Sequence, residues 1–147
     1  MLFITLLTAL NFSSVPTLTH VIPSPGRDRV WAVTSLDNDV FVARLTSQQV
    51  EVYDAVTFTL QRHITVPELG SAVYGMTACA RHMCLYLSDS GNVSVHRVEL
   101  SGSNAVKKWS VAGGPRGLSV NIAHNLVVAC HGAVSYTHLT LPTIYSV

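Results

Sequence analysis

Cys79, His82 and Cys84 are the residues whose types and spacing come closest to a metal site. A zinc ion needs about four ligands around it, and these usually come from tight turns. This C-x4-C segment offers at most three, and no second Cys/His pair with such spacing follows it. Both cysteines also have apolar neighbours, so we expect buried small side chains, no metal and no cofactor.

Catalytic arrangements are poorly represented in the chain. Its Ser, His and Asp residues do not occur in a nucleophile motif such as Gly-x-Ser-x-Gly. Asp37 and Asp39 share a predicted turn, where water solvates them instead of pairing them as acid and base. The glycine-rich segment 113–117 lacks Gly-Lys-Ser/Thr and precedes a predicted strand, so it is expected to be a connector and not a phosphate loop. We therefore expect a protein that is not an enzyme.

A binding surface is the stronger prediction. Platforms that bind single-stranded RNA interleave basic side chains with exposed aromatic rings. Four residues form a candidate partner-binding rim: Arg29, Trp31, Tyr74 and Arg116. Arg27 is a further basic residue that could join them. The alternative interpretation of the two aromatic residues is that they belong to the core.

Composition limits the remaining choices. The chain has 147 residues, 48% hydrophobic and 12% charged, which is enough for one domain with a core. The formal net charge of +1 gives no electrostatic argument for DNA, RNA or an anionic membrane. Three cysteines cannot pair completely, and such a sparse set favours a reducing, cytoplasmic compartment.

Residues 1–14 are a separate apolar segment. Their apolar run is too short to cross a bilayer, so no membrane span is expected. The run has the length of a secretory signal but lacks a basic start. If it is a signal peptide, the protein is secreted, and Asn11 and Asn92 become glycosylation sequons. A non-native start is the alternative.

The chain also repeats itself. The segments 29–43, 72–88 and 115–130 each contain an apolar run, a polar turn and a second apolar run. Ala32, Gly75 and Gly117 occupy equivalent places in them, 43 and 42 residues apart. This spacing indicates a repeated structural unit.

Each unit contains four short runs with strand-like alternation. The segments 48–54 and 91–97 both carry valine at alternate positions, which places Val50 with Val52, and Val93 with Val95, on one sheet face. Four strands in about 43 residues are typical of a β-propeller blade. We therefore predict an all-β protein: a partial, truncated β-propeller of four-stranded antiparallel blades.

The predicted propeller fragment covers residues 15–132 and about two and a half blades. Residues 17–22 would supply the last strand of one blade, 29–66 and 73–111 two full blades, and 115–132 the start of a third. The two outermost sheet faces would then be exposed to solvent. If each leaves about 400 Å² of apolar surface unburied, each loses roughly 10 kcal/mol of hydrophobic stabilisation, at about 25 cal/mol per Å². This indicates a fragment of a longer propeller.

Two turns and the tail complete the sequence predictions. Asp89-Ser-Gly-Asn92 is expected to be a tight turn with Gly91 at positive φ, and Lys107-Lys108 a solvated turn. Residues 133–147 depart from the repeat and resemble a translated adaptor sequence. The alternative is a divergent but genuine strand, "SYTHLTL".

The blades resemble NHL repeats, the propeller modules of many tripartite-motif proteins. "GGPRGLSVN" is similar to the family's Pro-x-Gly start, and Asp89 and Asn92 hold its expected Asp and Asn positions. The first blade departs from the pattern at Arg44 and the residues after it, and no Trp-Asp pair marks a WD40 blade. The resemblance implies a non-catalytic protein-interaction module, such as the substrate-recognition part of a ubiquitin ligase without a RING of its own. The alternatives are a secreted or cell-surface propeller and a propeller face that binds RNA.

Overall fold

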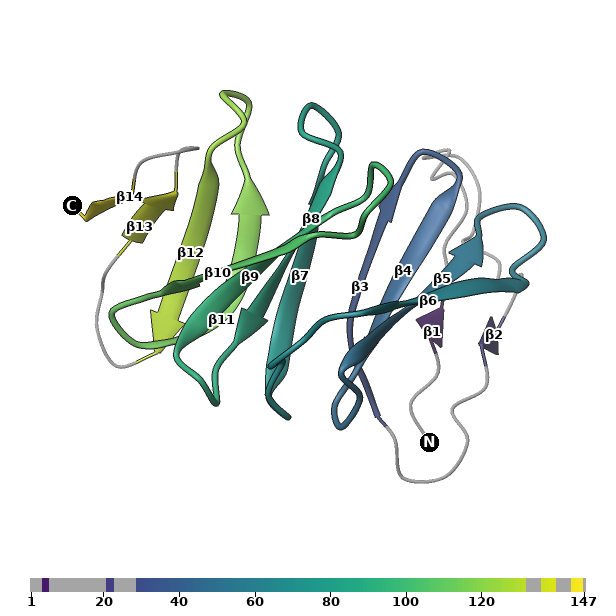
Figure 1. Cartoon of the computed structure of the whole chain (residues 1–147), viewed down its shortest axis with the longest axis horizontal. Helices are drawn as coiled ribbons and strands as arrows, with labels where there is room; N and C mark the ends of the chain where they lie inside the picture. Colours follow the sequence, from purple (N-terminus) through teal and green to yellow (C-terminus); the bar gives the residue numbers. More distant parts are fainter. Residues whose placement is uncertain (1–3, 6–20, 23–28, 132–135, 140–143, 147) are drawn as a thin grey trace, which may run out of the picture.

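Three antiparallel four-stranded sheets make up most of the computed structural model, which describes residues 4–5, 21–22, 29–131, 136–139 and 144–146 (Figure 1). Blade 1 contains β3 (Val30–Leu36), β4 (Asp39–Arg44), β5 (Gln49–Asp54) and β6 (Leu60–Thr65). Blade 2 contains β7 (Val73–Cys79), β8 (Cys84–Asp89), β9 (Ser94–Glu99) and β10 (Val106–Ser110). Blade 3 contains β11 (Gly114–Val120), β12 (Leu126–His131), β13 (Tyr136–Leu139) and β14 (Ile144–Ser146). The prediction of an all-β fold with antiparallel four-stranded sheets is confirmed.

The strands form because apolar residues occupy both faces of each sheet. In β4, Phe41 and Ala43 join the core on one face, while Val40 and Val42 join the core on the other. β8 is divided in the same way, and all six of its residues are buried. A sheet that is buried on both faces needs a neighbour on each side, as a propeller blade does.

Two of the cores lie between neighbouring blades. The first joins blade 1 to blade 2, and its largest members are Phe41, Ile64, Leu85 and Leu87. The second joins blade 2 to blade 3 through residues that include Cys84, Tyr86, Leu126 and Val128. The blades are therefore held together by side chains that pack face to face.

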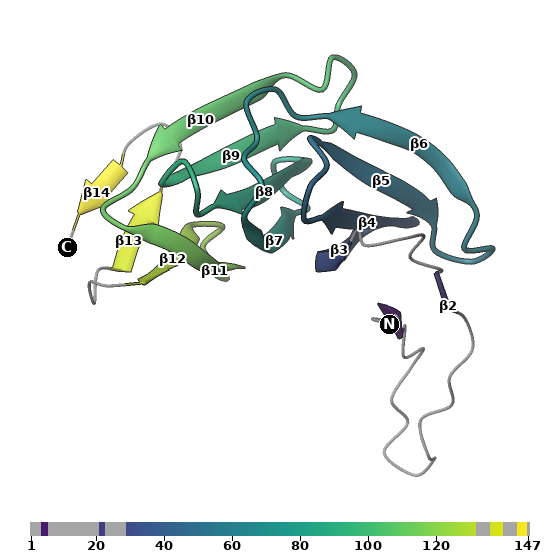
Figure 2. The ribbon, with the colours of Figure 1, turned by 90° about the horizontal axis from the view of Figure 1, so that it is seen from below.

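The blades fan out from their first strands. β3, β7 and β11 lie side by side along the concave edge, and β6 and β10 form the wider outer edge (Figure 2). We call β3, β7 and β11 the inner strands. This radial order brings equivalent residues of successive blades close together at the inner edge and separates them at the outer edge.

The two ends of the propeller differ from the sequence predictions. Of the predicted strand 17–22 the structure describes β2 (Val21–Ile22), which pairs with β1 (Ile4–Thr5) in a separate two-stranded sheet and not in a preceding four-stranded blade. Ile22 packs instead against the outermost face of blade 1, where Val40 and Val42 are almost completely buried. That face is therefore not open.

Blade 3 does not end at residue 132. β13 pairs with β12, and β14 pairs with β13, so the sheet has four strands. A strand at Tyr136–Leu139 agrees with the alternative interpretation of the tail. The boundaries 15–132 and 133–147, and the adaptor origin of the tail, stay predictions.

Local geometry corrects two further expectations. Val93, at φ 50°, and not Gly91 takes the left-handed conformation after Asp89, so Val93 is an exposed turn residue outside β9. Lys107 and Lys108 lie within β10 and not in a turn, because they continue the ladder opposite Arg97 and His96. Both lysines are exposed, as expected of a solvated pair.

Candidate functional site

The three inner strands carry a β-bulge at the same place. The register shifts between Val30 and Ala32 in β3, between Val73 and Met76 in β7, and between Pro115 and Gly117 in β11. The bulged positions are Trp31, Tyr74 with Gly75, and Arg116. Bulges turn side chains away from the regular alternation and are common next to functional sites. Here they release three large side chains from the packed faces.

These three side chains contact one another in blade order. The rings of Trp31 and Tyr74 meet edge to face, with centroids 4.9 Å apart and planes at 84°. The Arg116 guanidinium lies over the Tyr74 ring, with its carbon 5.0 Å from the ring centroid. Both contacts are attractive geometries for aromatic and cationic groups. We call Trp31, Tyr74 and Arg116 the aromatic rim.

The rim is accessible to solvent. Trp31 is 39% exposed, Arg116 is exposed and Tyr74 is partly buried, so the two aromatic side chains are not core residues. Arg29 is exposed just before β3, but its side chain takes no part in this stack. Arg27 lies outside the described residues. Binding of a partner by these four predicted residues stays a prediction.

A close contact between blades 2 and 3 supports the rim. Gly75 N–H donates to the Ser88 hydroxyl oxygen at 2.7 Å, and that hydroxyl lies 3.3 Å from the Arg116 carbonyl oxygen. A Cβ on Gly75 would overlap this carbonyl oxygen, which belongs to the backbone and cannot rotate away. Glycine at this bulge therefore allows the inner strands to approach each other.

A second network fastens the connector between blades 1 and 2. The Asp89 carboxylate accepts hydrogen bonds from Gly70 N–H at 2.9 Å, from both nitrogens of Asn92 and from His96. Asn92 also donates to the Glu68 carbonyl oxygen. The Asp-x-x-Asn pattern thus has a structural role here, which agrees with the turn expected from the sequence.

Burial and hydrogen bonding shift the pKa values in this network. Burial lowers the pKa of His96, and the Asp89 carboxylate opposes this only in part. Burial alone would raise the pKa of Asp89, but its hydrogen bonds from Gly70, Asn92 and His96 prevail and lower it. A neutral imidazole therefore donates its Nε2 proton to an ionised carboxylate, 3.1 Å away.

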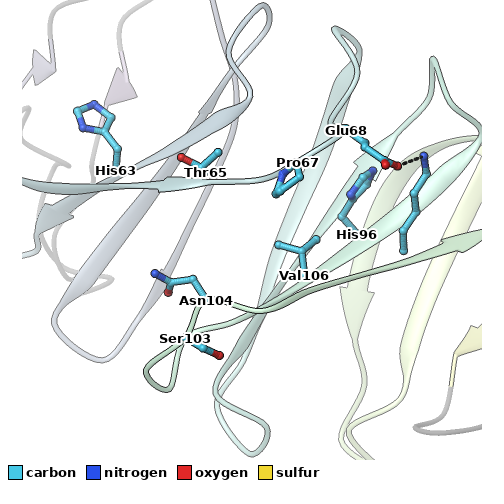
Figure 3. A pocket seen from close by; sticks show the side chains of 9 residues that line it. His63, Thr65, Pro67, Glu68, His96, Ser103, Asn104 and Val106 are labelled. Carbon is cyan, nitrogen blue, oxygen red and sulfur yellow. Dashed lines mark hydrogen bonds and ion pairs between the residues drawn. The ribbon is translucent and has the colours of Figure 1, made fainter.

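A polar pocket of about 560 Å³ lies between the outer parts of blades 1 and 2 (Figure 3). Its walls include residues from β6, from the connector and from the β9–β10 segment: His63, Glu68, His96, Asn104, Val106 and Lys108. Sequence reasoning missed this pocket. One signal was available, because His96 is a polar residue in an alternating strand, on a face where an apolar residue is expected.

The other sequence candidates lie apart from both sites. Cys79 and Cys84 are buried opposite each other in β7 and β8, and Cys79 Sγ lies 3.3 Å from His82 Nδ1. Within the described ranges, no group of three or more His, Cys, Asp or Glu side chains is arranged to hold a metal ion. Asp39 pairs with Arg62 at 3.0 Å and makes no pair with Asp37.

Comparison with known proteins gives the fold and no family. No family model and no curated protein matches the chain. No helix in the described part of the chain is long and apolar enough to span a membrane.

Among solved structures, the matches include β-propeller proteins. A streptogramin B lyase aligns with a TM-score of 0.69 and 13% identity over 80% of this chain, and virginiamycin B lyase from Staphylococcus aureus with 0.67 and 10% over 80%. A chain of a nidogen/laminin complex aligns with a TM-score of 0.70 and 10% identity over 86%. This chain spans 39%, 40% and 51% of those three structures. The likeness identifies a run of propeller blades.

Proposed function

We propose that the chain is a non-catalytic protein-interaction module whose partner binds at the aromatic rim. One observation carries this proposal: equivalent bulges in three successive blades bring Trp31, Tyr74 and Arg116 into one exposed stack. Aromatic and arginine side chains are enriched among the residues that dominate protein interfaces. Side chains that already stack on one another before binding lose less conformational entropy when a partner binds.

The resemblance to NHL repeats supports a finer proposal. As in that family, the module would recognise substrates for a ubiquitin ligase whose RING finger lies elsewhere. The sparse set of three cysteines, which cannot pair completely, favours a cytoplasmic location. A secreted or cell-surface propeller is the alternative if residues 1–14 act as a signal peptide.

RNA is the second candidate partner, because the rim combines arginine with aromatic rings. Protein is favoured because the predicted basic contacts are few (Arg27, Arg29 and Arg116) and the whole chain has a net charge of +1. An RNA-binding groove needs several phosphate contacts and shows a steep salt dependence.

Site-specific photo-crosslinking tests the proposal. A benzophenone amino acid replaces Trp31 in one variant and exposed Leu60 on the outer strand β6 in the control variant. We expect a protein adduct in cells from position 31, absent from position 60 and lost when Arg116→Ala is added. Adducts that are identical at both positions would contradict the proposal. Adducts to RNA from position 31 would support the second candidate.

A further inference from the structure

The aromatic rim carries a positive charge that no described carboxylate neutralises. Five ion pairs form among the described residues, and neither Arg116 nor the exposed Arg29 belongs to any of them. The Arg116 guanidinium lies over the Tyr74 ring, with its carbon 5.0 Å from the ring centroid. A guanidinium has five N–H donors, so it can bind an anion while it stays in contact with the ring.

The described carboxylates have other partners or lie far from the rim. Asp54 accepts hydrogen bonds from the N–H groups of Val56 and Thr57 in its own turn. Asp37 follows the far end of β3, about 20 Å along the strand from Trp31. The remaining five belong to the ion pairs: Asp39, Glu51, Glu68, Asp89 and Glu99. The charge of the rim therefore favours an anionic group on the partner.

The geometry of a guanidinium suits two kinds of anion, the carboxylate and the phosphate, because each accepts two parallel hydrogen bonds. A nucleic acid gains its affinity from several phosphate contacts at once. The described residues supply two exposed arginines here, Arg29 and Arg116. So few cations favour the single carboxylate of a peptide over the repeated phosphates of RNA.

Apolar surface lies at the other end of the rim. Trp31 and Val33 are each 39% exposed, and they are the large exposed apolar side chains of the inner strands. Two successive contacts, of 4.9 and 5.0 Å, lead from Trp31 through Tyr74 to Arg116. In an extended peptide, side chains two residues apart point the same way from Cα atoms about 6.6–6.8 Å apart. Such a pair of side chains can reach both ends of the rim.

We propose that the aromatic rim binds an extended acidic segment of a partner protein. A carboxylate of this segment pairs with the Arg116 guanidinium, and an apolar side chain two residues away packs on Trp31. This inference rests on the proposed function, because it names the chemistry of the partner that the rim binds.

The probe that tests it is a seven-residue peptide, acetylated and amidated so that its ends carry no charge. It has glutamate at its fourth position, phenylalanine at its second and sixth, and serine elsewhere, so that either chain direction gives the required spacing. The full chain is labelled with ¹⁵N-arginine and ¹⁵N-tryptophan. We expect saturable shifts of the Arg116 Nε and Trp31 Nε1 resonances, with a dissociation constant on the order of 1 mM.

Two altered peptides test the chemistry and the spacing. Glutamine in place of the glutamate should bind about fivefold more weakly, because a hydrogen bond to a charged group is stronger than a neutral one. Phenylalanines moved next to the glutamate should also weaken binding about fivefold, because adjacent side chains of an extended peptide point to opposite faces.

Two arginine variants provide the matched comparison. Arg116→Gln should remove the preference for the glutamate peptide over the glutamine peptide. Arg81→Gln should retain it, because Arg81 is exposed in the turn between β7 and β8, about 20 Å along β7 from Tyr74.

Equal affinity of the parent protein for the glutamate and glutamine peptides would overturn the acidic partner. The proposed function would survive that result if position 31 still crosslinked to a protein, and would fail with it if no protein adduct formed. Tighter binding of a uridine hexanucleotide than of the glutamate peptide would also overturn this inference, in favour of RNA.

Discussion

His96 Nε2 lies 3.1 Å from Asp89 Oδ2, and both side chains are completely buried between blades 1 and 2. The same carboxylate accepts the N–H of Gly70, so this pair links two strands of blade 2 to the connector that arrives from blade 1. An alternating strand with a polar residue on its buried face would be unfavourable without such a partner. The pair is therefore central to the packing of these blades.

Loss of the Asp89 carboxylate should be severe. Asp89→Ala leaves the N–H groups of Gly70 and His96 without acceptors in a buried site, so we expect the free energy of unfolding to fall by about 3 kcal/mol. Asp39→Ala is the control, because it removes only an exposed ion pair with Arg62 and should lower this energy by less than about 1 kcal/mol. Urea denaturation measures both. Equal effects would contradict the role of Asp89.

Stability should decrease as the pH falls. His96 has a lowered pKa in the folded protein, so below about 6.5 the unfolded chain takes up a proton that the folded chain does not. Asp89 also has a lowered pKa, and its contribution is present above about 3.9 and is lost as the pH falls through its folded value. We expect the urea midpoint to drop first below pH 6.5 and again below pH 4.

His96→Gln isolates the first of these steps. The variant should be less stable than the parent at pH 7.5, and the difference should narrow as the pH falls, because glutamine does not titrate. A difference that stays constant between pH 7.5 and pH 5 would show that His96 does not cause the pH dependence.

The close approach of the inner strands predicts a difference between two glycines. Gly75→Ala forces a methyl group against the Arg116 carbonyl oxygen and should destabilise the protein by about 2 kcal/mol. Gly117→Ala adds a methyl group at an ordinary contact distance of 3.5 Å from Ala129 Cβ and should change stability by less than about 1 kcal/mol. Thermal unfolding of both variants checks this. A Gly75→Ala protein as stable as the parent would exclude the tight contact.

The stacked guanidinium predicts a measurable coupling. In a double-mutant cycle of Arg116→Ala and Tyr74→Leu, we expect a coupling free energy of about 0.5–1 kcal/mol from the cation–π contact. A cycle of Arg116→Ala with Trp31→Leu should give a smaller value, because Trp31 packs on Tyr74. Similar coupling in the two cycles would contradict the observed order of the stack.

The sequence was informative about the strands because their burial follows the alternation. The second apolar run predicted within residues 29–43 is β4, where Val40 and Val42 face one core and Phe41 faces another. The repeat at equivalent positions identified the blades, and the residue types of Trp31, Tyr74 and Arg116 suggested a shared rim. Their mutual contacts depend on three bulges, which alternation alone does not reveal.

The features that could not be predicted from the sequence depend on contacts between segments far apart in the chain. The pairing of Val21–Ile22 with Ile4–Thr5 depends on which segments meet in space. The pocket likewise combines His63, Glu68, His96 and Lys108 from three strands and a connector, and no local motif relates them. The turn after Asp89 was predicted, but the left-handed residue was Val93, because the carboxylate and Asn92 fix the backbone there.

The central claim is that blades adjoin through their inner strands and so assemble the aromatic rim. Nuclear Overhauser contacts measure this directly, in a sample with selectively labelled tryptophan, tyrosine and arginine. We predict cross-peaks between the Trp31 indole and the Tyr74 ring, and between the Tyr74 ring and the Arg116 side chain. Their absence, with Tyr74 showing contacts to the outer strand β6 or β10 instead, would contradict the account.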